Sequence, residues 1–403
     1  MKKLHFVLVK AVIENLQEIF INQKYADKVV ALSLRGNAKF GSRDRKFIAS
    51  ATYDIVRWWR LFFEDYADNK IPSQGMLYKV FYTYLVWKEI AIPEWKEFEG
   101  LDFDTIKLRL ANITDKKTLE SIPDWLDELA TSQLGEDVWA EEISAMNNEA
   151  KLIIRANTKK TSANKLIEEL DKLELPAEYI KGFENAVWVK KRQKITSLPQ
   201  YSKGLFEVQD LGSQMIAPFL QVEPGMRVID ACAGAGGKTL HLAGLMNNKG
   251  KIVSMDITAK KLKELELRAK RNGFNIIDTV VIKGDDTISD FKESADRLLL
   301  DVPCSGLGVL KRNPDAKWKL SPSFIKEIVE TQRNILHRYT KMLKKGGLAV
   351  YATCSVLPAE NENQVKEFLA KNKDFTLVKE ERISPVNPLS DGYYMALLRK
   401  TQG

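Results

Sequence analysis

The feature that most constrains the fold is an alternation of apolar, strand-like runs with helical segments from about residue 211 onward. Five runs carry the pattern: "MRVIDACA", "KIVSMDI", "TVVIKGD", "DRLLLDVP" and "GGLAVYATCS". Helix-like stretches such as "AKKLKELELRAKRNG" separate them, and "FTLVKEERI" and "DGYYMALLRK" follow as two further strands. Such alternation is typical of a mostly parallel sheet with helices on both faces. The sequence therefore predicts an α/β, Rossmann-like domain with seven strands over residues 206–400.

The charge balance of the chain favours a polyanionic partner. Its 403 residues include 62 Lys and Arg against 54 Asp and Glu, which gives a formal charge of +8. This balance suits nucleic acid, although many basic proteins bind none. A chain of this length exceeds one ordinary core, so we expect two or three domains.

No segment predicts a membrane or a secreted protein. The apolar run in "MKKLHFVLVK" is interrupted by His5 and ended by Lys10, so it is too short for a signal peptide, and no stretch reaches the roughly 18 residues of a bilayer span. The three cysteines, Cys232, Cys304 and Cys354, are widely spaced and odd in number, which favours a reducing cytoplasm over a disulfide framework. Without a CxxC pair or histidines at ligand spacing, a zinc site is not expected. We expect a monomeric cytoplasmic protein without a metal.

Residues 1–135 are predicted to form an all-helical domain. Apolar residues recur there at steps of three or four, the period of one helix face, at Phe47, Ala51, Ile55, Trp58 and Phe62. We interpret these side chains as the core of a helix bundle. Just upstream, "GSRDRKF" puts Arg43, Arg45 and Lys46 at the expected start of a helix, where they would face solvent or contact RNA.

Residues 150–205 are predicted to form a small α+β, RRM-like subdomain that binds RNA. "KLIIRANTKK" and "NAVWVKKRQKI" look like strands on either side of the helix "SANKLIEELDKL". Between Arg155 and Lys203 there are 11 Lys and Arg against 6 Asp and Glu. Trp188 stands near Lys190, Lys191 and Arg192, a combination that suits base stacking beside phosphate contacts as well as a solvated face.

The loop "DACAGAGGKT" follows the first predicted strand and opens a helix. An ATP-binding P-loop would need glycine where Cys232 stands, and the dinucleotide pattern would need a third glycine where Thr239 stands. The remaining interpretation is a tight turn that lets backbone approach a ligand. The loop residues expected at that ligand are Cys232, Ala233, Gly234, Ala235, Gly236, Gly237 and Lys238.

Two aspartates at strand ends complete a nucleoside site. Asp256, in "VSMDI", can accept hydrogen bonds from both hydroxyls of a ribose. Asp285, in "KGDD", ends the third predicted strand and can approach an adenine amino group. Each aspartate alone would also suit a helix N-cap. Together with the glycine loop they describe a nucleoside cofactor that needs no phosphate, and S-adenosylmethionine fits best.

Two cysteines are predicted to share one mouth of the sheet. Cys304 follows the strand "LLLDVP", and Cys354 ends the strand in "VYATCSVLPAENENQV". If the two strands are neighbours, their backbones lie about 4.8 Å apart, so both thiols can face one pocket. Cys232, within the glycine turn, is more simply a small buried apolar residue. No histidine stands in a suggestive motif, so a Cys-His hydrolase is a poor alternative.

Three stretches resemble one enzyme family. "LDVPCSGLGVLKRNPDAKW", "YATCSVLPAENENQV" and "DACAGAGGKT" are similar to motifs of the RNA cytosine-C5 methyltransferases of the RsmB/Nop2/Sun group, in which Pro-Cys and Thr-Cys motifs lie on adjacent strands. The first stretch is most similar to the bacterial branch that acts on 16S ribosomal RNA. "RDRKFIASATYDIVRWW" resembles the NusB-like helical domain of that branch, and "IIRANTKKTS" and "VQDLGSQM" resemble the segment before its catalytic domain. The similarity covers most of the chain.

The resemblance implies a class I methyltransferase domain that forms 5-methylcytosine from S-adenosylmethionine. By resemblance, Cys354 is the nucleophile that adds to cytosine C6, and Cys304 assists release of the product. Asp301 is placed to hydrogen-bond the N3/N4 edge of the base and stands among the expected cofactor contacts. Lys238 either orients cofactor or base, or merely begins a helix. The family's loop normally has proline where this chain has Ala235, a departure that loosens the turn without removing cofactor binding.

The stretch after Cys304 is expected to hold the substrate. Arg312, Lys317 and Trp318 follow it in a loop predicted to contact the RNA backbone and the target base. A thiol reaches C6 only from the ring face, so the target must be unpaired or extruded. We therefore expect a single-stranded or loop target in 16S ribosomal RNA.

Three other functions stay open at this point. A DNA cytosine-C5 methyltransferase takes its nucleophile from the fourth-strand Pro-Cys and has no matching Thr-Cys, so Cys354 favours RNA. Transfer RNA is an alternative substrate, since close relatives divide between the two. A non-catalytic RNA-binding factor in ribosome assembly could keep the fold, but intact Cys304, Cys354 and Asp301 argue against it.

Overall fold

The computed structural model describes residues 4–64, 71–191 and 193–401 and divides into two compact units. The first contains the chain up to Asn147 together with Leu310–Pro322, and the second contains Asn148–Val309 and everything after Pro322. Both predicted C-terminal domains therefore belong to one unit. The helical unit, in contrast, extends beyond the predicted limit at residue 135 and takes up a short stretch of chain that follows Cys304.

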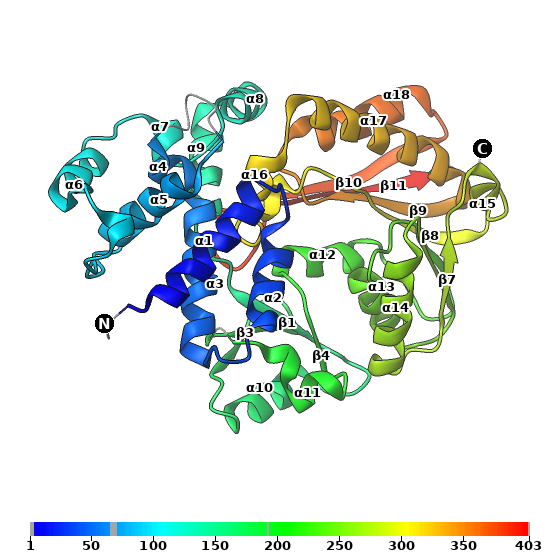
Figure 1. Cartoon of the computed structure of the whole chain (residues 1–403). Coiled ribbons are helices and arrows are strands. Elements are labelled where there is room, and N and C mark those ends of the chain that lie inside the picture. The colour runs from blue at the N-terminus through cyan, green and yellow to red at the C-terminus, as the bar shows by residue number, and fades with distance from the viewer. Residues whose placement is uncertain (1–3, 65–70, 192, 402–403) are drawn as a thin grey trace. The chain divides into compact units, whose positions relative to one another are not determined.

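The helical unit confirms the prediction for the first part of the chain (Figure 1). Its elements are α1 (Phe6–Phe20), α2 (Ala26–Gly36), α3 (Ser42–Arg57), α4 (Trp59–Phe62), α5 (Gln74–Trp87), η2 (Lys96–Phe98), α6 (Phe103–Ala111), α7 (Lys116–Leu119), α8 (Asp124–Leu134), α9 (Glu136–Met146) and α16 (Ala316–Lys319). The helix face predicted from the sequence lies in the core, where Ala51, Ile55 and Phe62 are buried and Phe47 and Trp58 pack against the same cluster.

The second unit begins with a four-stranded antiparallel sheet in the spatial order β2-β3-β1-β4. Its elements are β1 (Leu152–Ala156), α10 (Ala163–Asp171), β2 (Ala177–Tyr179), β3 (Ala186–Val189), η3 (Ile195–Ser197), α11 (Pro199–Ser202) and β4 (Phe206–Val208). This βαββαβ arrangement is ferredoxin-like, and we call residues 148–208 the ferredoxin-like subdomain. The structure confirms the two predicted strands and the helix between them. The sequence did not reveal β2 and β4, because three residues are too few to show a period.

The rest of the second unit is a seven-stranded sheet in the order β10-β11-β9-β8-β5-β6-β7. Its elements are α12 (Leu211–Phe219), β5 (Arg227–Asp230), α13 (Gly237–Leu245), β6 (Lys251–Asp256), α14 (Ala259–Asn272), β7 (Ile277–Val281), α15 (Asp285–Ser289), β8 (Ala295–Asp301), η4 (Leu307–Val309), α17 (Pro322–Tyr339), η5 (Thr340–Met342), β9 (Leu343–Thr353), η6 (Pro358–Glu360), α18 (Glu362–Lys371), β10 (Phe375–Ile383) and β11 (Tyr393–Lys400). The pairs that involve β11 are antiparallel, and the other four are parallel. The predicted Rossmann-like class is confirmed.

Helices cover both faces of this sheet (Figure 1). In β5, Val228 packs into the cluster with α12, α13 and α14, whereas its neighbour Ile229 packs into the cluster with α17 and α18. Strands buried on both faces read as continuous apolar runs, which explains why "LLLDVP" shows no alternation. The carboxyl ends of β5, β6, β8 and β9 meet at one edge of the sheet, and this is where such folds bind ligands.

In the described part of the chain, no helix combines the length and apolar character that crossing a membrane requires. The same residues contain no group of three or more His, Cys, Asp or Glu side chains placed to hold a metal ion. All three cysteines are free thiols.

Candidate active site

The two cysteine-bearing strands are neighbours, as expected. β8 and β9 pair in parallel, with Asp301 opposite Ala352. This register brings the Sγ atoms of Cys304 and Cys354 to 2.9 Å from each other. The backbone N–H of Cys354 also donates to the Cys304 sulfur, at 3.3 Å. The carboxyl edge of the sheet therefore holds two thiols in direct contact.

The surroundings give the two thiols different properties. The hydrogen bond to Cys354 and, next, burial raise the pKa of the Cys304 thiol well above its usual value. Cys304 thus keeps its proton at neutral pH and can donate it toward Cys354. Burial would lower the pKa of Lys238, but Asp301 and then the charge of Cys354 outweigh it, so that this pKa is raised. The Cys354 sulfur therefore has a hydrogen-bond donor and a positive charge nearby, which suits an attacking sulfur.

Lys238 does more than begin a helix, because it forms an ion pair with Asp301. Its Nζ lies 2.5 Å from Asp301 Oδ2. Lys238 is the second residue of α13, where the helix dipole disfavours a positive charge. The ion pair compensates for that placement and links the glycine loop to the end of β8.

A buried carboxylate that the sequence did not reveal joins both cysteine loops. Glu360 is 0% exposed. It accepts hydrogen bonds from the Ser305 N–H at 2.8 Å, from the Ser305 and Ser355 hydroxyls at 2.5 Å each, and from Gln332 Nε2 at 2.9 Å. Ser305 and Ser355 directly follow the two cysteines in the chain. Because four donors occupy this one carboxylate, the two loops are held at a fixed separation.

The glycine loop between β5 and α13 offers an open backbone surface. Gly234 and Gly236 have φ angles of +54° and +88°, in the left-handed region that glycine tolerates best. A Cβ added at Gly236 would lie 2.5 Å from Leu265 Cγ, whereas one added at Gly234 or Gly237 would meet no atom within 4 Å. One side of the loop thus packs on α14, and the other leaves room for a ligand, which fits the expected cofactor.

Asp256 holds this loop while keeping capacity for a ligand. At the end of β6, its Oδ2 accepts from the Gly234 N–H at 3.0 Å and its Oδ1 from the Thr258 N–H at 2.7 Å. Each carboxylate oxygen can accept a second hydrogen bond, so the predicted contact with ribose hydroxyls fits the geometry.

The remaining loop residues have structural contacts. The Ala233 N–H donates to the Met255 carbonyl at 2.9 Å, which sets the loop beside β6. The Ala235 carbonyl accepts from Arg268 Nη1 at 2.6 Å. Burial and then nearby carboxylates, Asp230 first, raise the pKa of the Cys232 thiol well above its usual value. Cys232 therefore keeps its proton, in agreement with a packing role.

Asp285 does not end the third strand. That strand, β7, stops at Val281, and Asp285 is the first residue of α15, where a negative charge suits the helix dipole. Its side chain is 75% exposed and forms an ion pair with Arg338. A contact with adenine would have to compete with this pair.

The prediction that Lys317 contacts RNA is wrong, because its side chain lies in the interior of the helical unit, whereas Trp318 is half-buried there. Lys317 is 1% exposed, and its Nζ donates to Asn147 Oδ1 at 3.1 Å. The indole N–H of Trp318 donates to the Val56 carbonyl at 2.6 Å, and the ring packs against the helical core. Arg312 lies in the same stretch of that unit.

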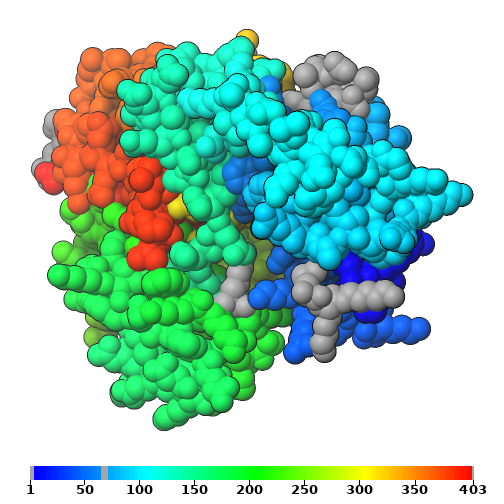
Figure 2. Space-filling model, turned by 90° about the vertical axis from the view of Figure 1, so that its left-hand side faces the viewer, coloured from blue at the N-terminus to red at the C-terminus, as the bar shows by residue number. Residues whose placement is uncertain are grey.

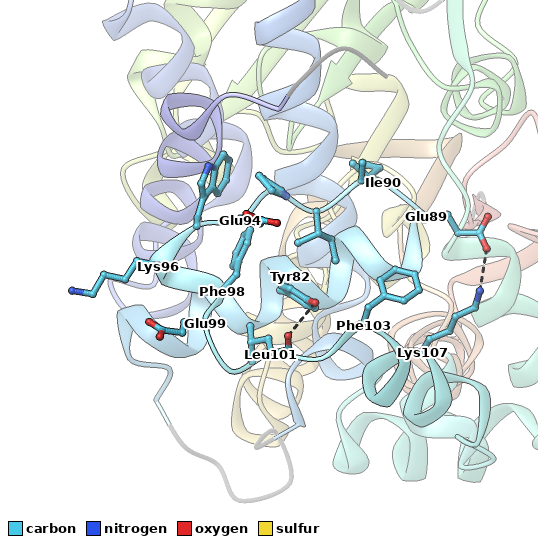
Figure 3. A pocket seen from close by; sticks show the side chains of 14 residues that line it. Tyr82, Glu89, Ile90, Glu94, Lys96, Phe98, Glu99, Leu101, Phe103 and Lys107 are labelled. Atoms are coloured by element: carbon cyan, nitrogen blue, oxygen red, sulfur yellow. Dashed lines mark hydrogen bonds and ion pairs between the residues drawn. The ribbon is translucent and has the colours of Figure 1, made fainter.

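Charge divides the helical unit into two kinds of surface. A cavity of about 900 Å³ opens between α5 and α6, lined by apolar side chains such as Ile90 and Phe98 (Figure 3). Residues 89–104 around it contain six Asp and Glu against one Lys, and Figure 2 shows chain near residue 100, in cyan, at the surface. This acidic region does not suit a phosphate backbone.

The basic region of the same unit lies in residues 24–46, with seven Lys and Arg against two Asp. Within it, Arg43 and Lys46 are exposed. Arg45, however, is half-buried and donates to the carbonyls of Leu34, Asn37 and Phe40. Its role is thus structural, whereas Arg43 and Lys46 are free to meet solvent or RNA.

Comparisons with known proteins agree with these motifs. The family model "16S rRNA methyltransferase RsmB/F" matches residues 217–398, and "Methyltr_RsmF/B-like, ferredoxin-like domain" matches residues 122–196. A probable ribosomal RNA small subunit methyltransferase B from Synechocystis is 33% identical over 314 residues, covering 72% of this chain and 70% of the relative. The ribosomal RNA small subunit methyltransferase B of Shewanella oneidensis is 35% identical over 292 residues, covering 69% of this chain and 67% of the relative.

Solved structures share the fold. The crystal structure of PH0851 has a TM-score of 0.83 at 24% identity and covers 99% of this chain and 100% of its own. NSun6 from Pyrococcus horikoshii, solved with the S-adenosylmethionine analogue SFG, has a TM-score of 0.65 at 23% identity and covers 71% of this chain and 100% of its own.

The family matches, together with the sheet order, identify an S-adenosylmethionine-dependent methyltransferase. Its substrate class is RNA. The chain belongs to the RsmB/F family of 16S rRNA methyltransferases.

Proposed function

We propose that this enzyme methylates carbon 5 of a cytosine in 16S ribosomal RNA through a covalent adduct on Cys354. The observation that carries the proposal is the pair of thiols with Sγ atoms 2.9 Å apart, at the edge that also holds Asp301 and Lys238. Carbon 5 of cytosine is a poor nucleophile until another group adds at carbon 6. A thiol nucleophile beside a cofactor loop meets that requirement.

The chain's own residues would act in sequence. The Cys354 sulfur adds to C6, and the electrons of the C5–C6 double bond shift to give a C4–C5 enamine as N3 takes up a proton, while Asp301 hydrogen-bonds the N3/N4 edge of the base. Bound S-adenosylmethionine would supply an electrophilic methyl group to C5 and leave as S-adenosylhomocysteine. A base then removes the C5 proton, the C6–S bond breaks, and its electrons return to the Cys354 sulfur. Cys304, which keeps its proton, assists this release.

Binding would be divided over the three predicted domains. Residues 206–400 hold S-adenosylmethionine through the glycine loop and Asp256, while residues 150–205 and 1–135 contact a single-stranded or loop target. In support, Trp188 is half-buried, and the Nζ atoms of Lys151 and Lys190 lie 5.6 and 5.4 Å from its ring centroid. Arg192, from the same predicted patch, lies outside the described residues. We propose a monomer in the cytoplasm, where free thiols persist.

The test is methylation of unmodified 16S ribosomal RNA by purified enzyme with labelled S-adenosylmethionine, compared for wild type, Cys354→Ala and Cys304→Ala. We expect labelled 5-methylcytosine with wild type, none with Cys354→Ala, and protein trapped on RNA with Cys304→Ala. Sequencing the trapped RNA would identify the target.

Parallel reactions separate the alternatives. Preferred methylation of unmodified transfer RNA would show that the substrate is transfer RNA instead of 16S ribosomal RNA. Methylation of DNA would show that the substrate is not RNA. If neither methylation nor an adduct appears on any of these substrates, the chain is a non-catalytic RNA-binding factor and the proposal fails.

A further inference from the structure

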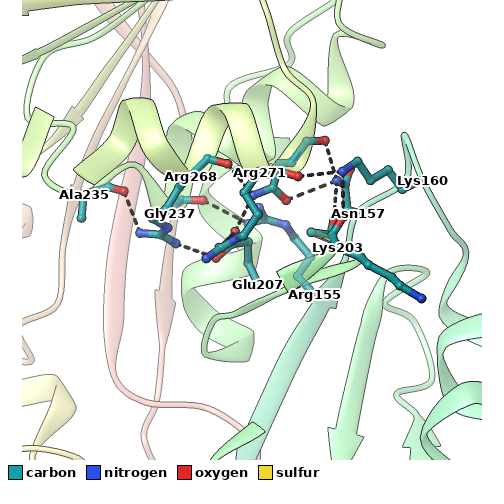
Figure 4. Close-up of polar contacts among 11 residues, drawn as sticks. Arg155, Asn157, Lys160, Lys203, Glu207, Ala235, Gly237, Arg268 and Arg271 are labelled. Atoms are coloured by element: carbon teal, nitrogen blue, oxygen red, sulfur yellow. Dashed lines mark hydrogen bonds and ion pairs between the residues drawn. The ribbon is translucent and has the colours of Figure 1, made fainter. Parts of the chain in front are cut away.

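The cofactor loop is held from outside by two arginines (Figure 4). Arg268, on α14, donates from Nη1 to the Ala235 carbonyl at 2.6 Å. Arg155, on β1, donates from Nη1 to the Gly237 carbonyl at 3.1 Å. These two carbonyls stand on either side of Gly236 in the chain, so the guanidinium groups fix both flanks of the left-handed residue.

Both arginines connect the loop to the ferredoxin-like subdomain: Arg155 belongs to it, and Arg268 pairs with its residue Glu207. Glu207, on β4, is 3% exposed and accepts from Arg268 Nη2 at 2.8 Å and from Asn272 Nδ2 at 2.6 Å, and it also pairs with Arg271. Burial would raise the pKa of Glu207, but Arg268 and the other donors outweigh it and lower this pKa, so the carboxylate is charged. Arg155 lies directly opposite Glu207 in the β1–β4 pair. The contact of Arg155 with the loop and the contact of Glu207 with Arg268 therefore begin at paired positions of β1 and β4.

The hydrogen bond from Arg268 is made at Ala235, the position where the loop departs from the family pattern. Proline, which the pattern has in place of Ala235, would fix one backbone angle and reduce the freedom of the loop. A charge-assisted hydrogen bond to the Ala235 carbonyl restrains the next peptide group instead. A loop that is ordered beforehand loses less conformational freedom when a ligand binds. The arginine can thus replace part of the rigidity that proline gives.

We propose that Arg268, held by Glu207, is a positioning residue for S-adenosylmethionine. It fixes the peptide group after Ala235 and so sets the affinity of the loop for the cofactor, which makes the ferredoxin-like subdomain part of the cofactor site. The proposal rests on the cofactor assignment and is independent of which RNA is modified.

The first test is equilibrium binding of S-adenosylhomocysteine to the full chain without RNA. Arg268→Ala is expected to raise Kd about tenfold, because a charge-assisted bond and the ordering of the loop are lost. Arg268→Lys should recover part of the affinity, since an ammonium cannot reproduce the fork geometry that bridges carbonyl and carboxylate. In turnover, the KM for S-adenosylmethionine should rise, while kcat at saturating cofactor and the KM for RNA change less than about twofold.

Arg271→Ala is the matched control. Arg271 pairs with the same carboxylate and stacks over Tyr201, with its guanidinium carbon 3.9 Å from the ring centroid, but its described contacts do not include the loop. We expect a similar fall in Tm for Arg271→Ala and Arg268→Ala, and an unchanged Kd only for the former. In the Arg268→Ala background, Glu207→Gln should add no further loss of affinity.

Two results would overturn the proposal: an unchanged Kd in Arg268→Ala, or equal weakening by Arg268→Ala and Arg271→Ala. A wild-type chain that fails to bind S-adenosylhomocysteine would instead count against the cofactor assignment itself. The two failures are therefore distinguishable.

Discussion

Cys304–Val309 and Leu310–Pro322 are contiguous in sequence and opposite in role. The first stretch lies at the catalytic edge of the sheet, where Cys304 contacts Cys354 and Ser305 binds Glu360. The second belongs to the helical unit, where its polar side chains form hydrogen bonds with backbone groups of that unit. Asp315 Oδ2, for example, accepts from the Ala26 N–H at 2.9 Å. One motif thus supplies a proposed catalytic thiol in its first half and a structural anchor in its second. Residue type alone does not separate the two halves, whereas the contacts that each half makes do.

The largest expected effect tests the catalytic half. Cys304→Ala should reduce multiple-turnover methylation by at least about 10³-fold, because the product would stay attached to the enzyme. The removal of one thiol from a half-buried position should shift Tm by only a few degrees (~2–4 °C). Measurement of both the rate and the covalently bound RNA checks this, and normal turnover by the variant would show that the first stretch is structural too.

The next effect concerns the carboxylate that joins the loops. Glu360→Ala leaves four donors without an acceptor and frees the loops, so activity should fall about 10²-fold. Glu360→Gln keeps the shape, and the serine hydroxyls can turn to accept from its amide, so its loss should be smaller. The measurement is kcat for both variants together with Tm. If the two lose activity in proportion to Tm alone, Glu360 supports the fold and does not position the thiols.

Trp318→Phe tests the structural half. An aromatic ring is kept, although a smaller one, and the hydrogen bond to the Val56 carbonyl is lost, which should cost about 1 kcal/mol of unfolding free energy. Methylation well below Tm should change less than about twofold, since this half-buried residue packs against the core of the helical unit. Urea unfolding and initial rates check the two values. A large loss of activity at unchanged stability would return Trp318 to the substrate contacts.

Lys317 predicts a pH dependence in the same half. Burial, followed by the charge of Arg57, lowers the pKa of Lys317 well below its usual range. The unfolded chain then binds a proton that the folded chain binds less readily, so the unfolding free energy falls as pH falls, by at most about 1.4 kcal/mol per pH unit. Lys317→Met removes this pH-dependent contribution to the unfolding free energy. The Tm of the variant minus that of wild type should therefore be larger at pH 6 than at pH 9, and a constant difference would contradict the argument.

Asp230 predicts a pH dependence of the opposite sign, in the unit that carries the seven-stranded sheet. Burial raises its pKa to about 7. Between the unfolded value of about 4 and 7, the folded chain keeps a proton that the unfolded chain loses, so stability falls as pH rises. Asp230→Asn should gain stability relative to wild type between pH 5 and pH 8. Thermal unfolding at both values tests this, and an equal difference at the two would contradict it.

Local patterns carried the predictions that succeeded. The runs that became β5, β6, β8 and β9 are continuous and apolar because both faces are covered, so the strands and their carboxyl-end loops could be predicted. The neighbouring positions of Cys304 and Cys354 were expected if the two strands are adjacent, as they are in the family that the motifs resemble. Arg43 and Lys46 stand at the start of α3 as expected from the helix period.

Two contacts that escaped prediction join residues that are distant in sequence. Glu360 meets Ser305 across 55 positions, and Glu207 meets Arg268 across 61, so no local pattern reveals either. Lys317 was misassigned because a lysine near a catalytic motif normally implies solvent or phosphate, whereas here its stem and ammonium are buried. The positions of such charges depend on the packing of whole domains, which one sequence does not display.

The single carboxylate between the cysteine loops has a consequence for how this enzyme can evolve. Because Glu360 is shared by Ser305 and Ser355, neither loop can change its length or its serine without disturbing the other. Drift in one loop would need a matching change in its partner. We therefore expect changes in the length or in the serine of one cysteine loop to be accompanied by changes in the other loop among related chains.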